Sequence, residues 1–276
     1  MLLEASDGHF YVVKFLNNPQ HPRILVNELI AHAIVSHLQI ATPPCVVLEV
    51  PESLLRGSPG AAIQLGNRLV VPQSGLAFGS RYPGNPDANA IYNFVPDSLI
   101  DRVQNSRDFL AALVFDRWVG NGDGRQTIFF RPPLGGGRRK KDFVALMIDN
   151  GFIFNGPEWT FVDSPILGLY PRRTVYRSVQ SLDDFEPWLE RVSNFPEALL
   201  HEAACRIPGA WIRGDEHKLD RLLRALLRRR RRIHELVEQS YEAFSNWKAV
   251  GQRSEEIDDI QIVAVPDIRN GEVKFA

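Results

Sequence analysis

The sequence predicts an α+β fold in which a small antiparallel sheet with one helix precedes a larger, mainly helical region. Three observations indicate this fold. Strand-like and helical segments alternate in the first 50 residues, helical patterns dominate the C-terminal third, and hydrophobic residues make up 44% of the 276-residue chain. A chain of this length buries about three quarters of its unfolded surface, so it can form a substantial core.

The N-terminal elements follow from local residue patterns. Residues 9–15 are rich in aromatic and β-branched side chains, which predicts a strand, and residues 1–5 are expected to pair with it in a hairpin. Residues 24–38 are apolar on almost every side of a helix, a pattern typical of a buried helix. Pro43 and Pro44 end this region, and residues 45–50 are predicted to form another short strand.

The middle of the chain combines an irregular segment with a helix and two strands. Residues 51–93 contain many Gly and Pro residues, which predicts an irregular connection. A helix is expected at 106–119 with Ser106 as its N-cap. Strands are expected at 127–130 and 143–148, joined by a basic loop at 135–141.

The C-terminal region is predicted to be mainly helical. Helices are expected at 184–192, 196–205 and 215–244, followed by a last hairpin within 260–275.

Charge and cysteine content exclude several classes of protein. The 32 basic and 33 acidic residues nearly cancel, which argues against a surface built throughout for nucleic acid. The chain has two cysteines, and its first residues lack the positive charge of a secretory signal, so we expect a cytoplasmic protein rather than a disulfide-stapled secreted one. No apolar run approaches the roughly 18 residues that a membrane span needs.

Two oppositely charged residues occur in apolar elements near the N-terminus. Lys14 lies in the strand at 9–15, and Glu28 is the one formally charged residue between Arg23 and Glu49. Because a lone buried charge is costly, pairing of Lys14 with Glu28 is the natural arrangement. The alternative is that each side chain reaches solvent independently.

Two aspartates occur at positions that suit a metal or phosphate site. Asp123 lies in a glycine-rich loop after the helix at 106–119, and Asp149 ends an apolar strand just before Gly151. Each alone is most simply a turn or cap residue. Together with the Lys14–Glu28 pair, they form the set of groups that a phosphoryl-transfer site of the kinase type requires.

The sequence resembles the bacterial HipA-like kinases, distant relatives of the eukaryotic protein kinases and of the phosphatidylinositol kinases. The resemblance covers roughly residues 1–233. Its strongest parts are FDRWVGNGD at 115–123 and MIDNG at 147–151, and PGAW at 208–211 also resembles the family. This resemblance implies a two-lobed, protein-kinase-like fold, with an N-lobe at 1–50 and a C-lobe at 51–276.

The resemblance also implies roles for individual residues. Lys14 would contact the α- and β-phosphates of ATP, and Glu28 would hold Lys14 in place. Asp123 would orient the acceptor hydroxyl and accept its proton, and Asp149 would bind Mg²⁺. Gln126 is the best candidate for a second metal ligand, in place of the Asn that the family usually has.

The implied activity is ATP- and Mg²⁺-dependent transfer of the γ-phosphate to a hydroxyl, with Ser or Thr of a protein as the expected acceptor. The adenine edge is expected to meet backbone groups of Leu48, Glu49 and Val50. Kinases of this kind have two strands and a turn upstream of the lysine, and only 13 residues precede Lys14. The alternatives are therefore a chain truncated at its start, or a pseudokinase that binds a nucleotide or a partner.

Five consecutive arginines, Arg228 to Arg232, fall within the expected helix at 215–244. They surround the whole helix, so we expect at least one of them to point inward and to need an acidic partner or a phosphate. The preferred interpretation is a solvated helix with internal ion pairs. The rival is a nucleic-acid-binding protein that uses this run together with the basic loop at 135–141.

Overall fold

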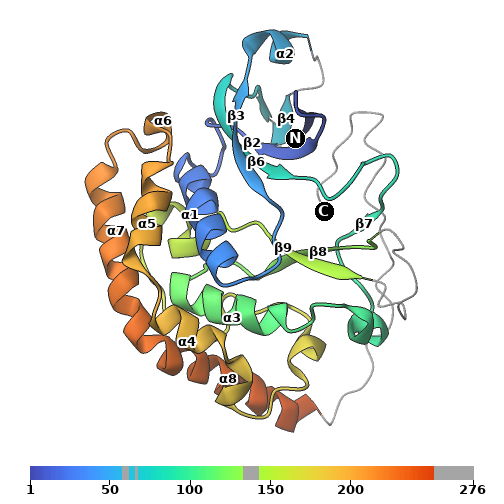
Figure 1. Ribbon diagram of the computed structural model, residues 1–276, viewed down its shortest axis with the longest axis vertical. Helices are drawn as coiled ribbons and strands as arrows, with labels where there is room; N and C mark the ends of the chain where they lie inside the picture. Colours follow the sequence, from blue (N-terminus) through green and yellow to red (C-terminus); the bar gives the residue numbers. More distant parts are fainter. Residues whose placement is uncertain (58–61, 66–67, 133–142, 252–276) are drawn as a thin grey trace.

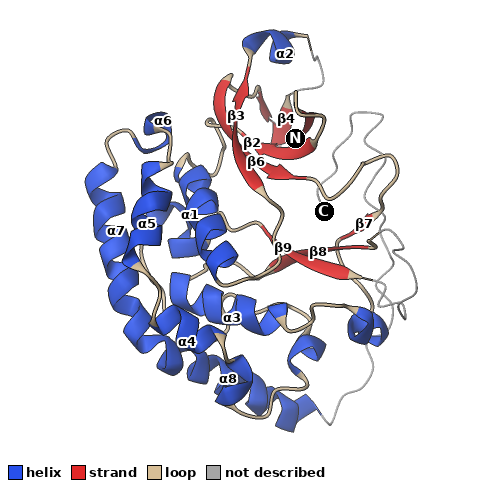
Figure 2. Cartoon of the chain, viewed as in Figure 1, coloured by secondary structure: helices blue, strands red, loops and turns tan. Residues whose placement is uncertain are grey.

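The computed structural model describes residues 1–57, 62–65, 68–132 and 143–251. It contains a small four-stranded sheet, a three-stranded sheet and a set of C-terminal helices (Figure 1). Most helices lie in the left and lower part of the view, and the strands lie in its upper and right-hand part (Figure 2). The mixed architecture, with a small antiparallel sheet at the N-terminus and helices after it, confirms the predicted fold class.

The four-stranded sheet is antiparallel throughout, in the order β1-β2-β6-β3. Its strands are β1 (Leu2–Glu4), β2 (Phe10–Lys14), β6 (Gly75–Arg81) and β3 (Cys45–Val50). The predicted N-terminal hairpin and the predicted strand at 45–50 are therefore present.

The central strand β6 was not expected from the sequence, which predicted an irregular connection across 51–93. The sequence pattern suggested that the glycines of this segment lie in loops, but Gly79 instead permits close packing of β6 against β3. A Cβ at Gly79 would lie 2.6 Å from Cδ1 of Leu48. Pairing on both edges supplies the hydrogen bonds that stabilise β6, whatever its local propensity. The small sheet consequently continues past residue 50, where the sequence analysis ended the N-lobe.

A short peripheral segment joins β3 to β6. It contains α2 (Glu52–Arg56) and a two-stranded ribbon of β4 (Ile63–Leu65) and β5 (Arg68–Val70).

Helix α1 (Arg23–His37) lies between the small sheet and the C-terminal helices (Figure 1). Its residues are buried on several sides, as its apolar sequence predicted. Arg23 Nε forms an ion pair of 2.7 Å with Asp215 Oδ2, and Trp211 Nε1 donates to the carbonyl of Leu76 at 3.1 Å. These contacts attach both α1 and the small sheet to the C-terminal helices.

The three-stranded sheet and α3 lie below the small sheet in the view of Figure 1. The sheet has the order β7-β8-β9, formed by β7 (Ile91–Tyr92), β8 (Gln126–Phe130) and β9 (Val144–Ile148). Helix α3 (Asp108–Val119) starts two residues later than predicted, and no side chain caps it, so the assignment of Ser106 as its N-cap was wrong. It ends at Gly120, whose φ of 61° lies in the left-handed region that favours glycine.

The C-terminal helices differ from the prediction in two places. The expected helix at 184–192 is a short 3₁₀ turn at 182–185 followed by α4 (Trp188–Ser193). The expected long helix at 215–244 is broken by a 3₁₀ turn at Arg230–Arg232. The helices of this region are α4, α5 (Glu197–Cys205), α6 (Gly209–Ile212), α7 (Glu216–Arg229) and α8 (Ile233–Gly251).

The predicted basic loop at 135–141 and the predicted hairpin within 260–275 lie outside the described residues. Among the described helices, none combines the length and the apolar character needed to span a membrane.

Candidate functional site

Lys14, Glu28 and Asp149 meet between the small sheet and the three-stranded sheet. Lys14 Nζ lies 2.6 Å from Glu28 Oε1 and 2.8 Å from Asp149 Oδ1. Their side chains come from β2, α1 and the turn after β9, and they are 23%, 5% and 36% exposed. The expected pairing of Lys14 with Glu28 is therefore present, and the two side chains do not reach solvent independently.

The electrostatics of this group keep Lys14 and Asp149 charged. Burial acts to lower the pKa of Lys14, but the charges of Glu28 and Asp149 outweigh it, so this pKa lies above its ordinary value. Burial acts to raise the pKa of Asp149, but the charge and hydrogen bond of Lys14 outweigh it, so this pKa lies below its ordinary value. The ammonium thus stabilises the ionised form of the Asp149 carboxyl group.

The backbone around Asp149 is tightly constrained. Asp149 has a φ of 53°, in the left-handed region, and the Asn150 N–H donates to Glu28 Oε2 at 3.2 Å. At Gly151 a Cβ would lie 2.6 Å from Cγ2 of Ile24. This close approach to α1 requires glycine and fixes the turn that follows Asp149.

Asn27, which the sequence patterns did not single out, helps to build the site. It is fully buried beside Glu28, and its Nδ2 is 2.7 Å from the carbonyl oxygen of Gly151 and 3.0 Å from that of Gly156. Its Oδ1 accepts a hydrogen bond of 2.8 Å from Trp159 Nε1. Asn27 thereby holds the segment after Asp149 against α1. The signal in the sequence was an amide next to a carboxylate in an otherwise apolar helix.

The loop that carries Asp123 lies directly against the segment after Asp149. The Gly122 N–H donates to the carbonyl of Phe152 at 2.9 Å, and the Asn155 N–H donates to the carbonyl of Gly120 at 3.1 Å. Asp123 is exposed, and its Oδ1 accepts a hydrogen bond of 2.7 Å from the Gly124 N–H. The structure therefore brings the two aspartate-bearing loops together.

A buried network below Asp123 joins its loop to the end of β9. Arg125 pairs with Asp116 of α3, and the two side chains are 1% and 0% exposed. Arg125 also donates to the carbonyl of Ile148 at 3.0 Å and to Asn150 Oδ1 at 2.9 Å. Asn121 donates to Asp116 Oδ1 at 2.9 Å. These contacts hold the positions on either side of both aspartates.

A cavity of about 270 Å³ opens beside Lys14 and Asp149. Its apolar walls come from both sheets and include Val12, Phe78, Ile128 and Ile148. Val12 is 43% exposed, which its position on this wall explains. The same cavity is lined by His32, whose pKa burial lowers.

The cavity does not extend to Leu48, Glu49 and Val50. These residues pair with Ala77, Leu76 and Gly75, at the end of β3 remote from the cavity. The segment that does line the cavity is 80–83, which includes the end of β6 and the residues after it. Contact of Leu48, Glu49 and Val50 with an adenine edge stays a prediction, and the lining of this cavity does not favour it.

The side chains available for a cation are carboxylates and one amide. Gln126 pairs with Ile148, the residue before Asp149, in the β8–β9 ladder. Its Nε2 is 3.4 Å from Asp123 Oδ2. No group of three His, Cys, Asp or Glu side chains in the described part of the chain could bind a metal ion unaided. Mg²⁺ suits such a site, because it is usually held by one or two carboxylates together with substrate phosphates.

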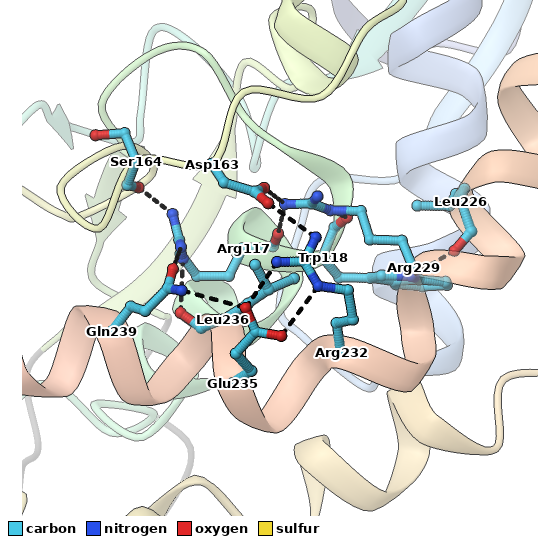
Figure 3. A network of polar contacts seen from close by, with 10 residues as sticks. All are labelled: Arg117, Trp118, Asp163, Ser164, Leu226, Arg229, Arg232, Glu235, Leu236 and Gln239. Carbon is cyan, nitrogen blue, oxygen red and sulfur yellow. Dashed lines mark hydrogen bonds and ion pairs between the residues drawn. The ribbon is translucent and has the colours of Figure 1, made fainter.

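Two of the five arginines in the run, Arg229 and Arg232, form ion pairs within the protein. Arg229 is 7% exposed and pairs with Asp163, and its Nε donates to the carbonyl of Trp118 at 2.9 Å (Figure 3). Arg232 lies 3.0 Å from Asp163 and 2.7 Å from Glu235. The prediction that one arginine turns inward to an acidic partner is confirmed, and that arginine is Arg229.

Arg117 is a second inward arginine in this network (Figure 3). Its Nε donates to the carbonyl of Leu236 at 2.9 Å, and it also contacts Ser164 and Gln239. Burial and the charge of Arg229 lower the pKa of Arg117 to about 10. The network attaches the segment at 163–164 to α8.

Comparison with known proteins agrees with these observations. A search of curated proteins finds no match. The model of the HipA-like kinase family matches residues 2–130, which include Lys14, Glu28 and Asp123. This match covers slightly less than half of the chain, and it supports the resemblance to the HipA-like kinases that the sequence motifs indicate.

Proposed function

We propose that this protein is an ATP- and Mg²⁺-dependent kinase that transfers the γ-phosphate to a hydroxyl group of Ser or Thr in a protein. The observation that carries the proposal is the position of Lys14 Nζ, within 2.8 Å of both Glu28 and Asp149 at the edge of an apolar cavity. An ammonium, an orienting carboxylate and a metal-binding carboxylate are three recurring parts of kinase sites.

The cavity suits a nucleotide with its adenine in the apolar part. We place the base between Val12 and Phe78 of the small sheet and Ile128 and Ile148 of the three-stranded sheet. The segment at 81–83 replaces Leu48, Glu49 and Val50 as the candidate for contact with the adenine edge. The phosphates would then extend toward Lys14 and Asp149.

Lys14 would contact the α- and β-phosphates, and Glu28 would keep its ammonium in position. Asp149 would hold a Mg²⁺ ion, with Gln126 as the candidate for a second site. The ion would neutralise charge that develops on the phosphates. Positioning and charge neutralisation are the main contributions that a protein makes to phosphoryl transfer.

The transfer itself assigns a role to Asp123. The acceptor hydroxyl oxygen bonds to the γ-phosphorus while the bond from this phosphorus to the β–γ bridging oxygen breaks, and ADP leaves. The hydroxyl proton passes to the Asp123 carboxylate. The exposed position of Asp123, in a loop packed against the segment after Asp149, supports this role.

Two measurements on the same variants test the proposal: thermal stability with and without Mg-ATP, and phosphate transfer from labelled ATP. We expect Asp149→Ala to lose the Mg²⁺-dependent stabilisation by ATP. Asp123→Ala should retain it while transfer falls by about 10²–10⁴-fold. Asp220→Ala is the control, because Asp220 is exposed and pairs with Arg224 on its own helix. The kinase proposal fails if neither Asp123→Ala nor Asp149→Ala changes the ATP-dependent behaviour.

The same experiment separates the alternatives. A pseudokinase would be stabilised by the nucleotide in the parent protein without transferring phosphate. A nucleic-acid-binding protein would show affinity that falls steeply with salt. Ion pairs already occupy Arg229 and Arg232, which disfavours the run as a nucleic-acid surface.

A further inference from the structure

A second cavity, of about 400 Å³, adjoins the candidate nucleotide cavity. The two share Asn93, Ile128 and Ile148 in their walls. Gln126, whose Nε2 is 3.4 Å from Asp123 Oδ2, lines the second cavity. A group that enters this cavity therefore comes close to the proposed proton acceptor while the first cavity holds the nucleotide.

The far wall of the second cavity is held in place by the Asp123 loop. Tyr170, Pro171 and Arg172 form this wall. The Gly168 N–H donates to the carbonyl of Asp123 at 3.2 Å, and the Arg125 N–H donates to the carbonyl of Leu169 at 3.2 Å. A ligand in the second cavity would thus be positioned relative to Asp123 by direct backbone contacts.

The two arginines of this cavity are already paired with carboxylates. Arg125 pairs with Asp116, and Arg172 Nε donates to Asp97 Oδ1 at 2.6 Å. Burial acts to raise the pKa of Asp97, but its hydrogen bonds to Thr174 and Arg172 outweigh this and keep the pKa below its ordinary value. Each cation is therefore balanced, which disfavours a highly charged ligand such as a phosphoinositide headgroup.

The remaining walls suit a peptide with an apolar side chain. Phe94, Tyr170 and Pro171 supply apolar surface, and the Arg172 guanidinium covers the Phe94 ring at 4.9 Å. Asn93 is an exposed amide in this wall, and an amide can both donate to and accept from a peptide backbone.

We propose that this second cavity binds the acceptor segment, and that the segment is an uncharged stretch of protein with an apolar residue beside the phosphorylated Ser or Thr. The proposal rests on the proposed kinase function, because it needs ATP in the first cavity. It adds a basis for substrate specificity. Because Arg172 and Asp97 neutralise each other, neither acidic nor basic residues beside the acceptor would find an unpaired opposite charge.

The test is phosphate transfer to three sets of Ser-centred peptides whose flanking residues are apolar, acidic or basic. We expect the parent protein to prefer the apolar set. Asp97→Asn leaves Arg172 unbalanced, so relative transfer to the acidic set should rise about fivefold. Arg172→Gln leaves Asp97 unbalanced, so relative transfer to the basic set should rise by a similar factor. Loss of folding alone would not produce opposite shifts.

Asp101→Asn is the matched control. Asp101 pairs with Arg177, and this pair joins residues 97–102 to residues 172–177, as the Asp97–Arg172 pair does. Neither Asp101 nor Arg177 lines the cavity. This variant should keep the preference of the parent. Mg-ATP stabilisation, measured in parallel, should be unchanged in all three variants.

The outcomes distinguish this proposal from the kinase function. The acceptor proposal is overturned if all variants share one flanking preference, or if Mg-ATP stabilises the parent but no peptide is phosphorylated. It is also overturned if transfer occurs instead to vesicles of phosphatidylcholine with phosphatidylinositol. If Mg-ATP has no effect on the parent and no acceptor is phosphorylated, the kinase function fails, and the acceptor proposal fails with it.

Discussion

Arg125 and Asp116 form an ion pair that is almost completely shielded from solvent, directly beneath the loop that carries Asp123. One partner lies two residues after Asp123, and the other lies in α3. The pair therefore connects the loop that carries Asp123 to the buried core of the protein. A buried pair of this kind is costly to break from one side only.

Replacing Arg125 by Met should destabilise the protein by about 3–5 kcal/mol, because the Asp116 carboxylate is left buried without its partner. Chemical denaturation measures this change in the free energy of unfolding. Adding Asp116→Asn to Arg125→Met should restore part of the loss, since the buried charge is then removed. An Asp116→Asn/Arg125→Met protein that is less stable than Arg125→Met alone would contradict the explanation.

The depressed pKa of Asp149 predicts a pH-dependent contribution to stability. Because the folded pKa lies below the unfolded value of about 3.9, the contribution is fully present above that value and is lost as the pH falls through the folded pKa. The stability difference between the parent and Asp149→Asn should thus be constant near neutral pH and should shrink below about pH 4. Urea unfolding across this range measures it, and a difference that stays constant would refute the assignment.

The close contact at Gly151 predicts a cost for even a single added methyl group. Gly151→Ala should destabilise the protein by about 1–3 kcal/mol, because the new Cβ would overlap Cγ2 of Ile24. Gly209→Ala is the control, since a Cβ there meets no atom within 4 Å. In an Ile24→Ala background the cost of Gly151→Ala should fall, and an unchanged cost would show that the contact with Ile24 is not its origin.

Within the arginine run, substitution of Arg229 should lower the stability of the protein, whereas substitution of exposed arginines should not. Arg229→Met should lower the free energy of unfolding by about 2–4 kcal/mol, because Asp163 and two backbone carbonyls lose a buried donor. Arg228→Met and Arg231→Met, at exposed positions, should change it by less than about 0.5 kcal/mol. Equal effects at the three positions would contradict the structural role of Arg229.

Local sequence patterns predicted the elements whose hydrophobic periodicity and residue propensities agree with the secondary structure that they form. The hairpin of β1 and β2, the buried helix α1 and the strands β8 and β9 were of this kind. Strand β6 was not predicted, because its glycines at 75 and 79 are explained by partners in β2 and β3 that local sequence does not show. Tertiary pairing overrides weak propensity at such positions.

The candidate site was predictable where a charged residue occurs in an otherwise apolar strand or helix. Lys14 and Glu28 were identified as a pair for that reason, and the structure places them 2.6 Å apart. Asn27 carries no charge and gave a weaker signal. Which segment follows the sheet into the cavity depends on the order of strands in the sheet, which differs from their order along the chain. The roles of these residues in phosphate transfer stay predictions.

The attachment of the small sheet to the C-terminal helices has a mechanical consequence. Trp211 and Asp215 bond to Leu76 and Arg23 near α6, whereas the connection from β6 to β7 runs along the opposite side of the view in Figure 1. Lys14 of β2 forms a further link, because its ammonium bonds to Asp149 after β9. A displacement of the small sheet away from the helices would therefore have to break the hydrogen bond of Trp211 or the ion pair of Lys14.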